Sequence, residues 1–161
     1  MKTLILFTSH HGTTKKLAYQ LAKDLGISDE CVVDFKKNKN IDLSAFDLVI
    51  MGSSIHAGNI PSDFKKFLQN KINILLSKQI AIFMCAMEKT ELKIQEFENN
   101  FPKELREHSL ANGIMGGEYL FERMNFFEKF MIKKITGSPE SKSEIDYDVY
   151  KDFVEKLKLS A

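Results

Sequence analysis

The sequence predicts an α/β fold, a doubly wound five-stranded parallel sheet with helices on both faces. Apolar runs of strand length alternate along the chain with segments whose apolar residues recur at helical spacing. The apolar runs within residues 3–7, 47–54 and 79–86 show no alternation, which is typical of strands covered on both faces. No repeat or linker divides residues 1–161, and a chain that is 43% hydrophobic suits one domain with a sizeable core.

The first two strands flank a well-defined helix. A strand over residues 3–7 leads into a helix over residues 13–25, whose apolar residues follow helical spacing. Gly26 stands where a C-terminal cap belongs. The second strand is expected over residues 30–35, and the polar segment 36–46 predicts a loop or a short, poor helix.

The third and fourth strands are separated by a short helical region. The strand over residues 47–54 runs into a loop of small residues. Pro61 suits the first turn of a helix that buries Phe64 and Phe67. The fourth strand is expected over residues 79–86.

The remaining elements complete the alternation. A helix is expected over residues 90–100, with Pro102 kinking or restarting it. The fifth strand follows over residues 109–117, and helices are predicted over residues 122–135 and 146–159. The stretch TGSPESKSE between these last two helices predicts a loop.

Charge and cysteine content exclude some classes of protein. Basic and acidic residues nearly cancel at a net charge of +1, so nothing indicates a nucleic-acid binder. Cys31 and Cys85 each fall in an apolar run that predicts a strand, and neither belongs to a CxxC or Cys/His cluster. Two buried, reduced thiols are expected, which suits a cytoplasmic protein.

The turn after the first strand reads TSHHGTT and carries four hydroxyl groups and one glycine. It enters a helix whose first N–H groups have no partner within the helix and whose dipole favours an anion. A helix capped by its hydroxyl residues is the alternative, but their density favours an anion site. The expected site consists of Thr8, Ser9, His10, His11, Gly12, Thr13 and Thr14.

The loop also indicates which anion it holds. It lacks G-x-x-x-x-G-K-[ST] and G-x-G-x-x-G, so neither a P-loop nor a dinucleotide fingerprint is present. A receiver domain needs an aspartate at the end of the third strand, where residues 52–54 are Gly-Ser-Ser. A phosphate monoester bound mainly by neutral donors remains.

The stretch LILFTSHHGTTKKLA resembles the phosphate loop of flavodoxins, T/S-x-x-G-x-T after a first strand. The resemblance implies a flavodoxin-like sheet of order 2-1-3-4-5 and FMN as cofactor, with its 5′-phosphate on this loop. It also implies that the flavin ring lies between the loops after the third and fourth strands. The ring contacts expected on that basis are Ser53, Ser54, Ile55, His56, Ala57, Gly58, Ala86, Met87, Glu88 and Gly117.

The stretches GSSIHAGNIPSDFKKF and FFEKFMIKKITG resemble the bacterial flavodoxin-type protoporphyrinogen oxidases, which use quinone as acceptor. This resemblance covers nearly the whole chain. It implies a heme-biosynthesis enzyme that dehydrogenates protoporphyrinogen IX and passes the electrons through FMN to a quinone or another acceptor. The loop Ile55-His56-Ala57-Gly58 departs from that family, which tends to have a basic and then an aromatic residue there.

Two other functions remain open. One is a flavodoxin-type electron-transfer protein without a substrate of its own, and the other is an interaction module that has lost the flavin. Electron-carrier flavodoxins generally have a strongly acidic surface, so a net charge of +1 favours the enzyme. No acid or base stands out as a catalytic residue.

The histidines of these loops also have more than one interpretation. His56 either lies beside the flavin as a hydrogen-bond donor or proton relay, or is a solvated loop residue. The adjacent His10 and His11 are expected to point apart. Without a carboxylate or cysteine partner, they are expected to form no metal site.

The segment 119–135 is unusually rich in aromatic and apolar residues, with basic residues among them. Three interpretations are open for it: a buried core helix, a homodimer face, or a helix that contacts a membrane surface, where a quinone would be found.

Overall fold

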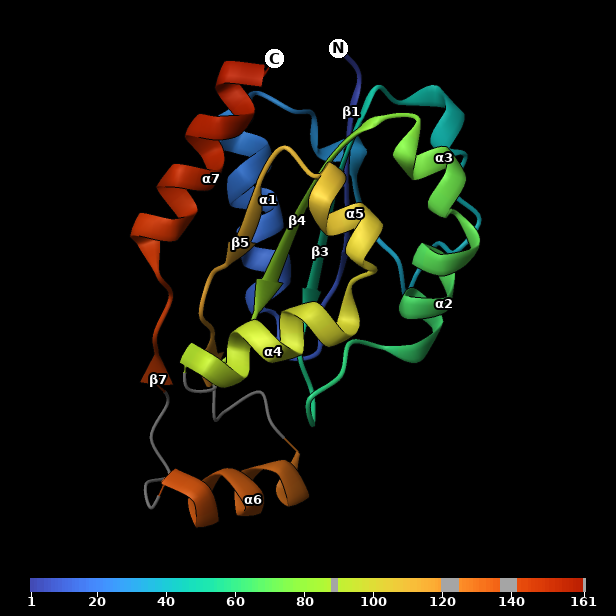
Figure 1. Cartoon of the computed structure of the whole chain (residues 1–161). Helices are drawn as coiled ribbons and strands as arrows, with labels where there is room; N and C mark the ends of the chain where they lie inside the picture. The colour runs from blue at the N-terminus through green and yellow to red at the C-terminus, as the bar shows by residue number, and fades with distance from the viewer. Residues whose placement is uncertain (88–89, 120–124, 137–141, 161) are drawn as a thin grey trace.

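The computed structural model describes residues 1–87, 90–119, 125–136 and 142–160. Its centre is an all-parallel five-stranded sheet of order β2-β1-β3-β4-β5, so the predicted fold and strand order are confirmed (Figure 1). The strands are β1 (Thr3–Thr8), β2 (Val32–Asp34), β3 (Leu48–Ser54), β4 (Gln79–Cys85) and β5 (Asn112–Ile114).

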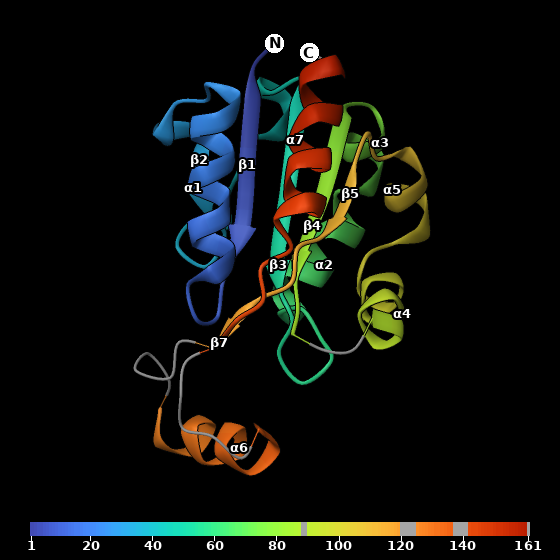
Figure 2. The same cartoon turned by 90° about the vertical axis from the view of Figure 1, so that its left-hand side faces the viewer.

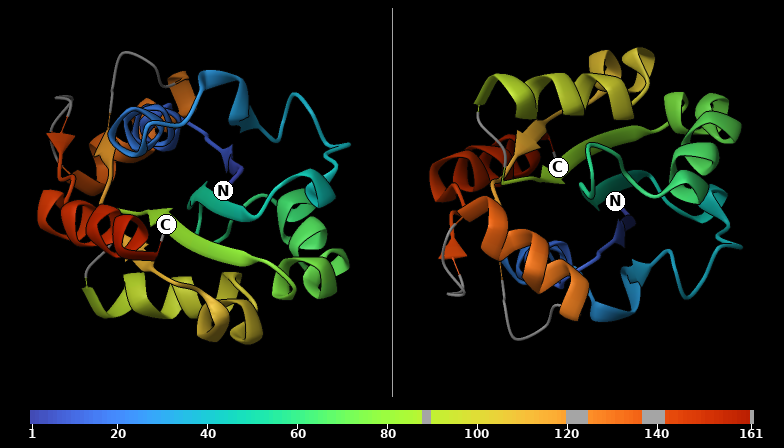
Figure 3. Two further views of the ribbon diagram at one scale, coloured as in Figure 1. Left: turned by 90° about the horizontal axis from the view of Figure 1, so that it is seen from above. Right: turned by 90° about the horizontal axis from the view of Figure 1, so that it is seen from below.

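Helices cover both faces of this sheet (Figure 2). One face carries α1 (Thr13–Leu25) and α7 (Tyr147–Ser160), and the other carries α2 (Ser62–Asn70), α3 (Ile72–Leu76), α4 (Thr90–Asn100) and α5 (Lys103–His108). Viewed along the strands, the sheet lies between these two helical layers (Figure 3). Each layer therefore has its own hydrophobic core, and the carboxyl ends of the strands meet at one edge.

Neighbouring residues of the central strands point to opposite faces. In β1, Leu4 packs in the core beneath α2–α5, whereas Ile5 packs in the core beneath α1 and α7. Both side chains are fully buried, which explains why these strands read as continuous apolar runs. Gly52 of β3 pairs with Phe83 of β4, and a Cβ on Gly52 would lie 2.1 Å from the Phe83 ring.

The second strand is shorter than expected. The 3-10 turn η1 (Asp29–Cys31) takes the place of its start, and η2 (Leu43–Ala45) lies in the polar segment that follows. Cys31 is half-buried in η1, so the expectation of a buried strand cysteine was wrong for this residue. Cys85 is buried in β4, and both thiols are free.

Beyond β5 the chain leaves the sheet. A two-stranded antiparallel ribbon joins β6 (Glu118–Tyr119) to β7 (Lys142–Ser143), with α6 (Phe126–Thr136) between them. The stretch predicted to be only a loop thus contains β7. Gly116 has φ of 71°, and a Cβ there would lie 1.9 Å from the Glu144 carbonyl oxygen, so the two passes of the chain are in close contact.

Helix α6 lies beyond the carboxyl end of the sheet, outside the two helical layers (Figures 1 and 2). Phe126, Phe127 and Phe130 are 88%, 70% and 57% exposed. The interpretation of this segment as a core helix was therefore wrong for these residues. Among the helices that the structure describes, none is both long and apolar enough to cross a bilayer.

Candidate functional site

The loop between β1 and α1 forms the first wall of the site. The chain turns at Gly12, whose φ of 99° favours glycine and which occupies the N-cap position of α1. Its N–H donates to the Ser9 hydroxyl oxygen at 2.9 Å. Among the residues that the structure describes, no side chain caps α1, and its first turn contains no acidic residue. The helix therefore presents free N–H groups and the positive end of its dipole to this loop.

Two hydroxyl groups in this wall lack a strong hydrogen-bond partner. Thr8 and Thr14 are fully buried, and within the described part of the chain their Oγ1 atoms make no hydrogen bond to nitrogen or oxygen. The Thr14 hydroxyl faces the Cys85 thiol, and sulfur is a weak partner. An unsatisfied buried polar group costs about 1–3 kcal/mol. These hydroxyls do not cap α1, which argues against the plain-cap alternative. Two spare donors beside an uncapped helix end fit a phosphate monoester.

The loop after β3 forms the second wall and is a tight, well-anchored turn. His56 and Asn59 exchange two backbone hydrogen bonds, at 2.9 and 3.1 Å. Between them, Ala57 and Gly58 have φ of 48° and 77°. The buried Asn100 amide donates to the Gly58 carbonyl oxygen at 2.9 Å, so it holds the turn from α4. Nothing in the sequence marked Asn100 for this positioning role.

The first two walls are linked to each other. The backbone N–H of His10 donates to the Ser54 hydroxyl oxygen at 3.1 Å. Ser54 is the last residue of β3, and the neighbouring Ser53 is fully buried. The two loops therefore hold their relative position through a hydrogen bond.

The third wall follows β4. The N–H of Ala86 donates to the Gly116 carbonyl oxygen at 2.9 Å. A Cβ on Gly117 would lie 2.9 Å from Met87 Cγ, so the chain after β5 packs directly on this loop. Burial raises the pKa of the Cys85 thiol to about 12, which leaves it protonated and unreactive at neutral pH. Glu88 lies outside the described residues.

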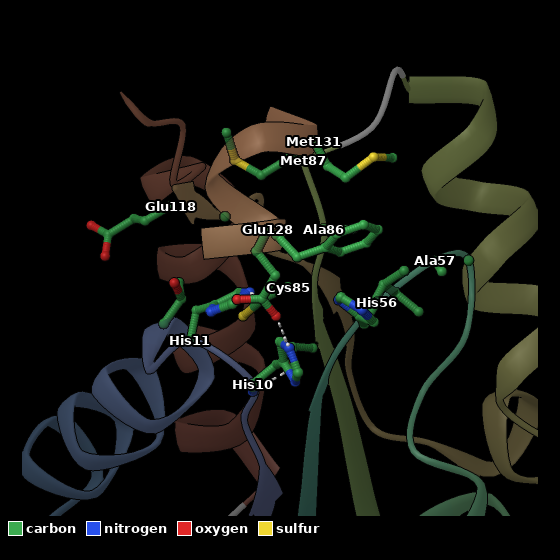
Figure 4. Close-up of a pocket in the computed structure, with 16 residues that line it drawn as sticks. His10, His11, His56, Ala57, Cys85, Ala86, Met87, Glu118, Glu128 and Met131 are labelled. Atoms are coloured by element: carbon green, nitrogen blue, oxygen red, sulfur yellow. Dashed lines mark hydrogen bonds and ion pairs between the residues drawn. The ribbon is translucent and has the colours of Figure 1, made fainter. Parts of the chain in front are cut away.

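These three walls and α6 enclose a cavity of about 420 Å³ (Figure 4), within the ~300–1,000 Å³ usual for cofactor sites. Predicted residues that line it are His10, His11, Thr13, Ser54, Ile55, His56, Ala57, Gly58, Ala86, Met87 and Gly117. The predicted residues Thr8, Ser9, Gly12, Thr14 and Ser53 do not line this cavity. Thr8 and Ser53 lie at the carboxyl ends of β1 and β3, Ser9 and Gly12 lie in the loop after β1, and Thr14 lies in the first turn of α1. Lining residues that the sequence did not indicate are Cys85, Glu118, Phe127, Glu128 and Met131.

The histidines of the two loops come together at this cavity. The ring centroids of His10 and His11 lie 4.3 Å apart, and those of His10 and His56 also lie 4.3 Å apart. A Glu128 carboxylate oxygen lies 2.7 Å from His10 Nε2 and 3.8 Å from His11 Nε2. The expectation that His10 and His11 diverge without a carboxylate partner was therefore wrong.

Electrostatics in this cluster favour a charged carboxylate beside a neutral imidazole. Burial lowers the pKa of His11, and the neighbouring His10 lowers it further. Burial alone would raise the pKa of Glu128, but hydrogen bonds from His10 and from the Asn125 backbone outweigh it and lower the pKa.

A reciprocal cap fixes Glu128 at the start of α6. The Asn125 side-chain oxygen accepts from the Glu128 N–H at 2.9 Å. In return, the Glu128 carboxylate accepts from the Asn125 N–H at 3.1 Å. The same carboxylate thus caps its helix and reaches His10 of the first loop. The sequence indicated an unusual helix here but not that it lies over this cavity.

Comparison with known proteins assigns the chain to a protein family. The model of the flavodoxin domain family matches residues 4–146, so the chain belongs to that family. This membership supports FMN as the cofactor of the protein.

Particular relatives sharpen the assignment. The chain is 26% identical over 159 residues to protoporphyrinogen IX dehydrogenase [quinone] of Escherichia coli K12, covering 91% of this chain and 87% of that protein. It is 34% identical over 115 residues to the flavodoxin-like domain-containing protein BilS of Clostridioides difficile, covering 65% of this chain and 60% of that protein. Oxidised Flavodoxin 2 from Bacillus cereus superposes with a TM-score of 0.50 at 27% identity, covering 73% of this chain and 82% of that one.

Proposed function

We propose that the protein is an FMN-dependent oxidoreductase. The observation that carries the proposal is the pair of buried hydroxyls of Thr8 and Thr14 beside the start of α1, neither of which has a nitrogen or oxygen partner among the described residues. A phosphate ester bound there would accept hydrogen bonds from both hydroxyls and from the first N–H groups of the helix. Ser9, Gly12 and Thr13 complete the phosphate loop.

The rest of the cavity suits the flavin ring. Bound FMN supplies the redox chemistry, because its ring takes electrons from one molecule and passes them to another. The turn from Ser54 to Gly58 provides one side of the ring site, and Ala86 and Met87 provide the other. Asn100 keeps the turn in place from α4. His56 lies on the cavity wall, where its imidazole can donate to the ring or relay a proton.

A porphyrinogen, oxidised with a quinone as acceptor, is the substrate that we propose. The E. coli relative is named for this reaction. Phe127 and Met131 of α6 add apolar wall beside Met87, which suits a large, mostly apolar ring system. The proposed location is cytoplasmic. Helix α6 is proposed to contact either a second copy or a membrane surface, which sedimentation and vesicle flotation distinguish.

The experiment has two stages. FMN binding is measured by quenching of flavin fluorescence, and protoporphyrinogen IX oxidation is then assayed with and without a soluble quinone. We expect one FMN per chain and oxidation that accelerates when quinone is present. Chains that bind FMN but leave protoporphyrinogen IX unoxidised would contradict the substrate, and chains that bind no FMN would contradict the whole proposal.

A second candidate is a one-domain electron carrier. The similarity to Flavodoxin 2 supports it, as does the Ile55-His56-Ala57-Gly58 loop, which lacks the aromatic residue of the oxidases. This candidate predicts bound FMN that a flavodoxin reductase reduces, with no oxidation of protoporphyrinogen IX.

A further inference from the structure

The side chains of His10, His11, His56 and Glu128 form a cluster that flavin binding alone does not explain. One ligand atom from each of the four residues lies within 4.8 Å of every other. In Figure 4 the three imidazoles and the carboxylate lie close to one another among the residues that line the cavity. They come from three separate parts of the chain: the loop after β1, the loop after β3, and α6.

We propose that these four residues bind one divalent transition-metal ion, with Zn²⁺ as the best-matched probe. Three imidazole nitrogens and one carboxylate oxygen are a ligand set that Zn²⁺ uses in four-coordinate sites. Ca²⁺ and Mg²⁺ prefer oxygen ligands alone, and the soft Cu⁺ prefers sulfur. The ligand set therefore favours ions of intermediate softness, such as Zn²⁺, over the hard Ca²⁺ and Mg²⁺ and the soft Cu⁺.

The geometry needs only small side-chain movements. In a tetrahedral site with bonds of about 2.0–2.1 Å, ligand atoms lie about 3.3 Å apart. His10 Nε2 and His11 Nε2 lie 2.7 and 3.8 Å from the same Glu128 oxygen, which brackets that separation. The side chains of His10 and His11 are 38% and 22% exposed, so rotation about their side-chain bonds can bring the remaining ligand atoms inward.

The metal would also have a structural consequence. Glu128 is separated from His10 by 118 residues in the sequence. A metal held by both would clamp α6 onto the loops that follow β1 and β3. Because α6 lies outside the helical layers, this clamp would restrict its movement more than that of any sheet element (Figure 2).

The chain offers a matched control for the ligands. His108, the last residue of α5, donates a hydrogen bond from Nε2 to the Lys78 carbonyl oxygen. Glu107 beside it pairs with Lys103 and is not part of the cluster. Substituting His108 and Glu107 removes one histidine and one glutamate without touching the proposed site.

The test uses the full chain as purified, freed of metal with EDTA and kept in phosphate-free buffer. Calorimetric titration with ZnCl₂ is done on wild type, His56→Gln, Glu128→Gln and the control His108→Gln/Glu107→Gln. We expect one zinc per chain at micromolar or tighter Kd. Even outer-sphere partners change metal affinity about 10–100-fold, so each ligand variant should raise the Kd at least about 10-fold and the control should not.

A second measurement reports on geometry. Zinc should slow amide hydrogen exchange in residues 126–136 of the wild type and of the control, and not of Glu128→Gln. The proposal is overturned if no zinc binds, if the ligand variants bind as wild type does, or if the control loses zinc to the same extent. It is also overturned if zinc binds without slowing exchange in α6. FMN binding is measured separately, so loss of this proposal and loss of the proposed function give different results.

Discussion

Phenylalanines lie in two contrasting regions of this molecule. Phe64 of α2, Phe83 of β4 and Phe153 of α7 are at most 1% exposed and fill the layers on either side of the sheet. Phe126 and Phe130 of α6 are 88% and 57% exposed. Both groups have the same side chain, so hydrophobicity alone did not decide burial. What differs is that the β6–β7 ribbon carries α6 beyond the edge of the sheet, where the helical layers leave it no core to enter.

The largest expected effect comes from truncating one phenylalanine in each region. Phe64→Ala should lower the free energy of unfolding by about 4 kcal/mol, because it removes a buried ring and leaves a cavity. Phe126→Ala should change it by less than about 0.5 kcal/mol, as exposed positions usually do. Urea unfolding followed by circular dichroism measures both. Equal losses in the two variants would mean that α6 packs in a core after all.

The next effect probes how tightly the sheet region is packed. Gly52→Ala places a Cβ 2.1 Å from the ring of Phe83, which is fully buried and packs edge-to-face on Phe153. Overpacking of this kind costs about 1–3 kcal/mol, and we expect the upper end. The same unfolding experiment measures it.

A control separates crowding from the loss of glycine. At Gly26, with φ of 67°, an added Cβ meets nothing within 4 Å. Gly26→Ala should therefore lower the free energy of unfolding only by the roughly 1–2 kcal/mol that the left-handed conformation costs a residue with a Cβ. Combining Gly52→Ala with Phe83→Leu should recover part of the loss. If the double variant shows purely additive losses, the ring is not the cause.

Periodicity made the sheet region predictable. Parallel strands buried on both faces read as unbroken apolar runs, and the helix that starts at Thr13 shows its apolar stripe and its Gly26 cap in the sequence. Errors fell where local chemistry competes, as at η1, where three residues form a 3-10 turn in place of the start of β2. The loop over residues 8–14, for which we propose phosphate binding, could be picked out from the sequence because its motif is contiguous.

The α6 region was less predictable because its structure depends on contacts distant in sequence. The sequence shows the high aromatic content of residues 119–135. However, an apolar helix has the same sequence pattern whether it packs in a core or lies at an edge of the molecule. The contact from Glu128 to His10 spans 118 residues, and no local pattern predicts it. The β6–β7 ribbon pairs only Glu118 and Tyr119 with Lys142 and Ser143, which is too short to leave an alternating signal.

A third prediction separates stability from function in the buried region. Thr14→Val removes a buried hydroxyl that has no nitrogen or oxygen partner among the described residues, and it keeps the side-chain shape. Without cofactor, the free energy of unfolding should stay the same or rise by up to about 1 kcal/mol, because the desolvation penalty of the hydroxyl disappears. FMN affinity should fall about 10–100-fold, the equivalent of one hydrogen bond to a charged group. Fluorescence titration measures the FMN affinity, and urea unfolding of the flavin-free chain measures the free energy of unfolding.

Ser44→Ala is the control for Thr14→Val. Ser44 lies in η2, its hydroxyl donates to Asp42, and it lines no part of the cavity. It should leave FMN affinity unchanged. A Thr14→Val chain that is less stable and binds FMN as tightly as wild type would show that this hydroxyl serves the fold and not the phosphate.

The smallest expected effect tests how α7, unlike α6, is fastened to the body. The hydroxyl of the buried Tyr150 donates to an Asp24 carboxylate oxygen at 2.6 Å, which joins α7 to α1. Tyr150→Phe should lower the free energy of unfolding by about 1 kcal/mol at neutral pH, since the carboxylate side of this bond is solvated. Tyr147→Phe, at a 54% exposed position of the same helix, should leave it unchanged.

The pH dependence of that loss distinguishes the hydrogen bond from packing. The hydrogen bond from Tyr150 holds the pKa of Asp24 below its usual value of 3.8, so the folded state binds the proton less readily than the unfolded state does. The stabilisation is therefore complete above about pH 5 and is lost as the pH falls through the lowered pKa of the folded protein. The difference in unfolding free energy between wild type and Tyr150→Phe should shrink over that acid range, as measured by urea unfolding from pH 7 downward. A difference that stays constant would assign the effect to packing around the ring, and the hydrogen bond to Asp24 would then contribute nothing to holding α7 on α1.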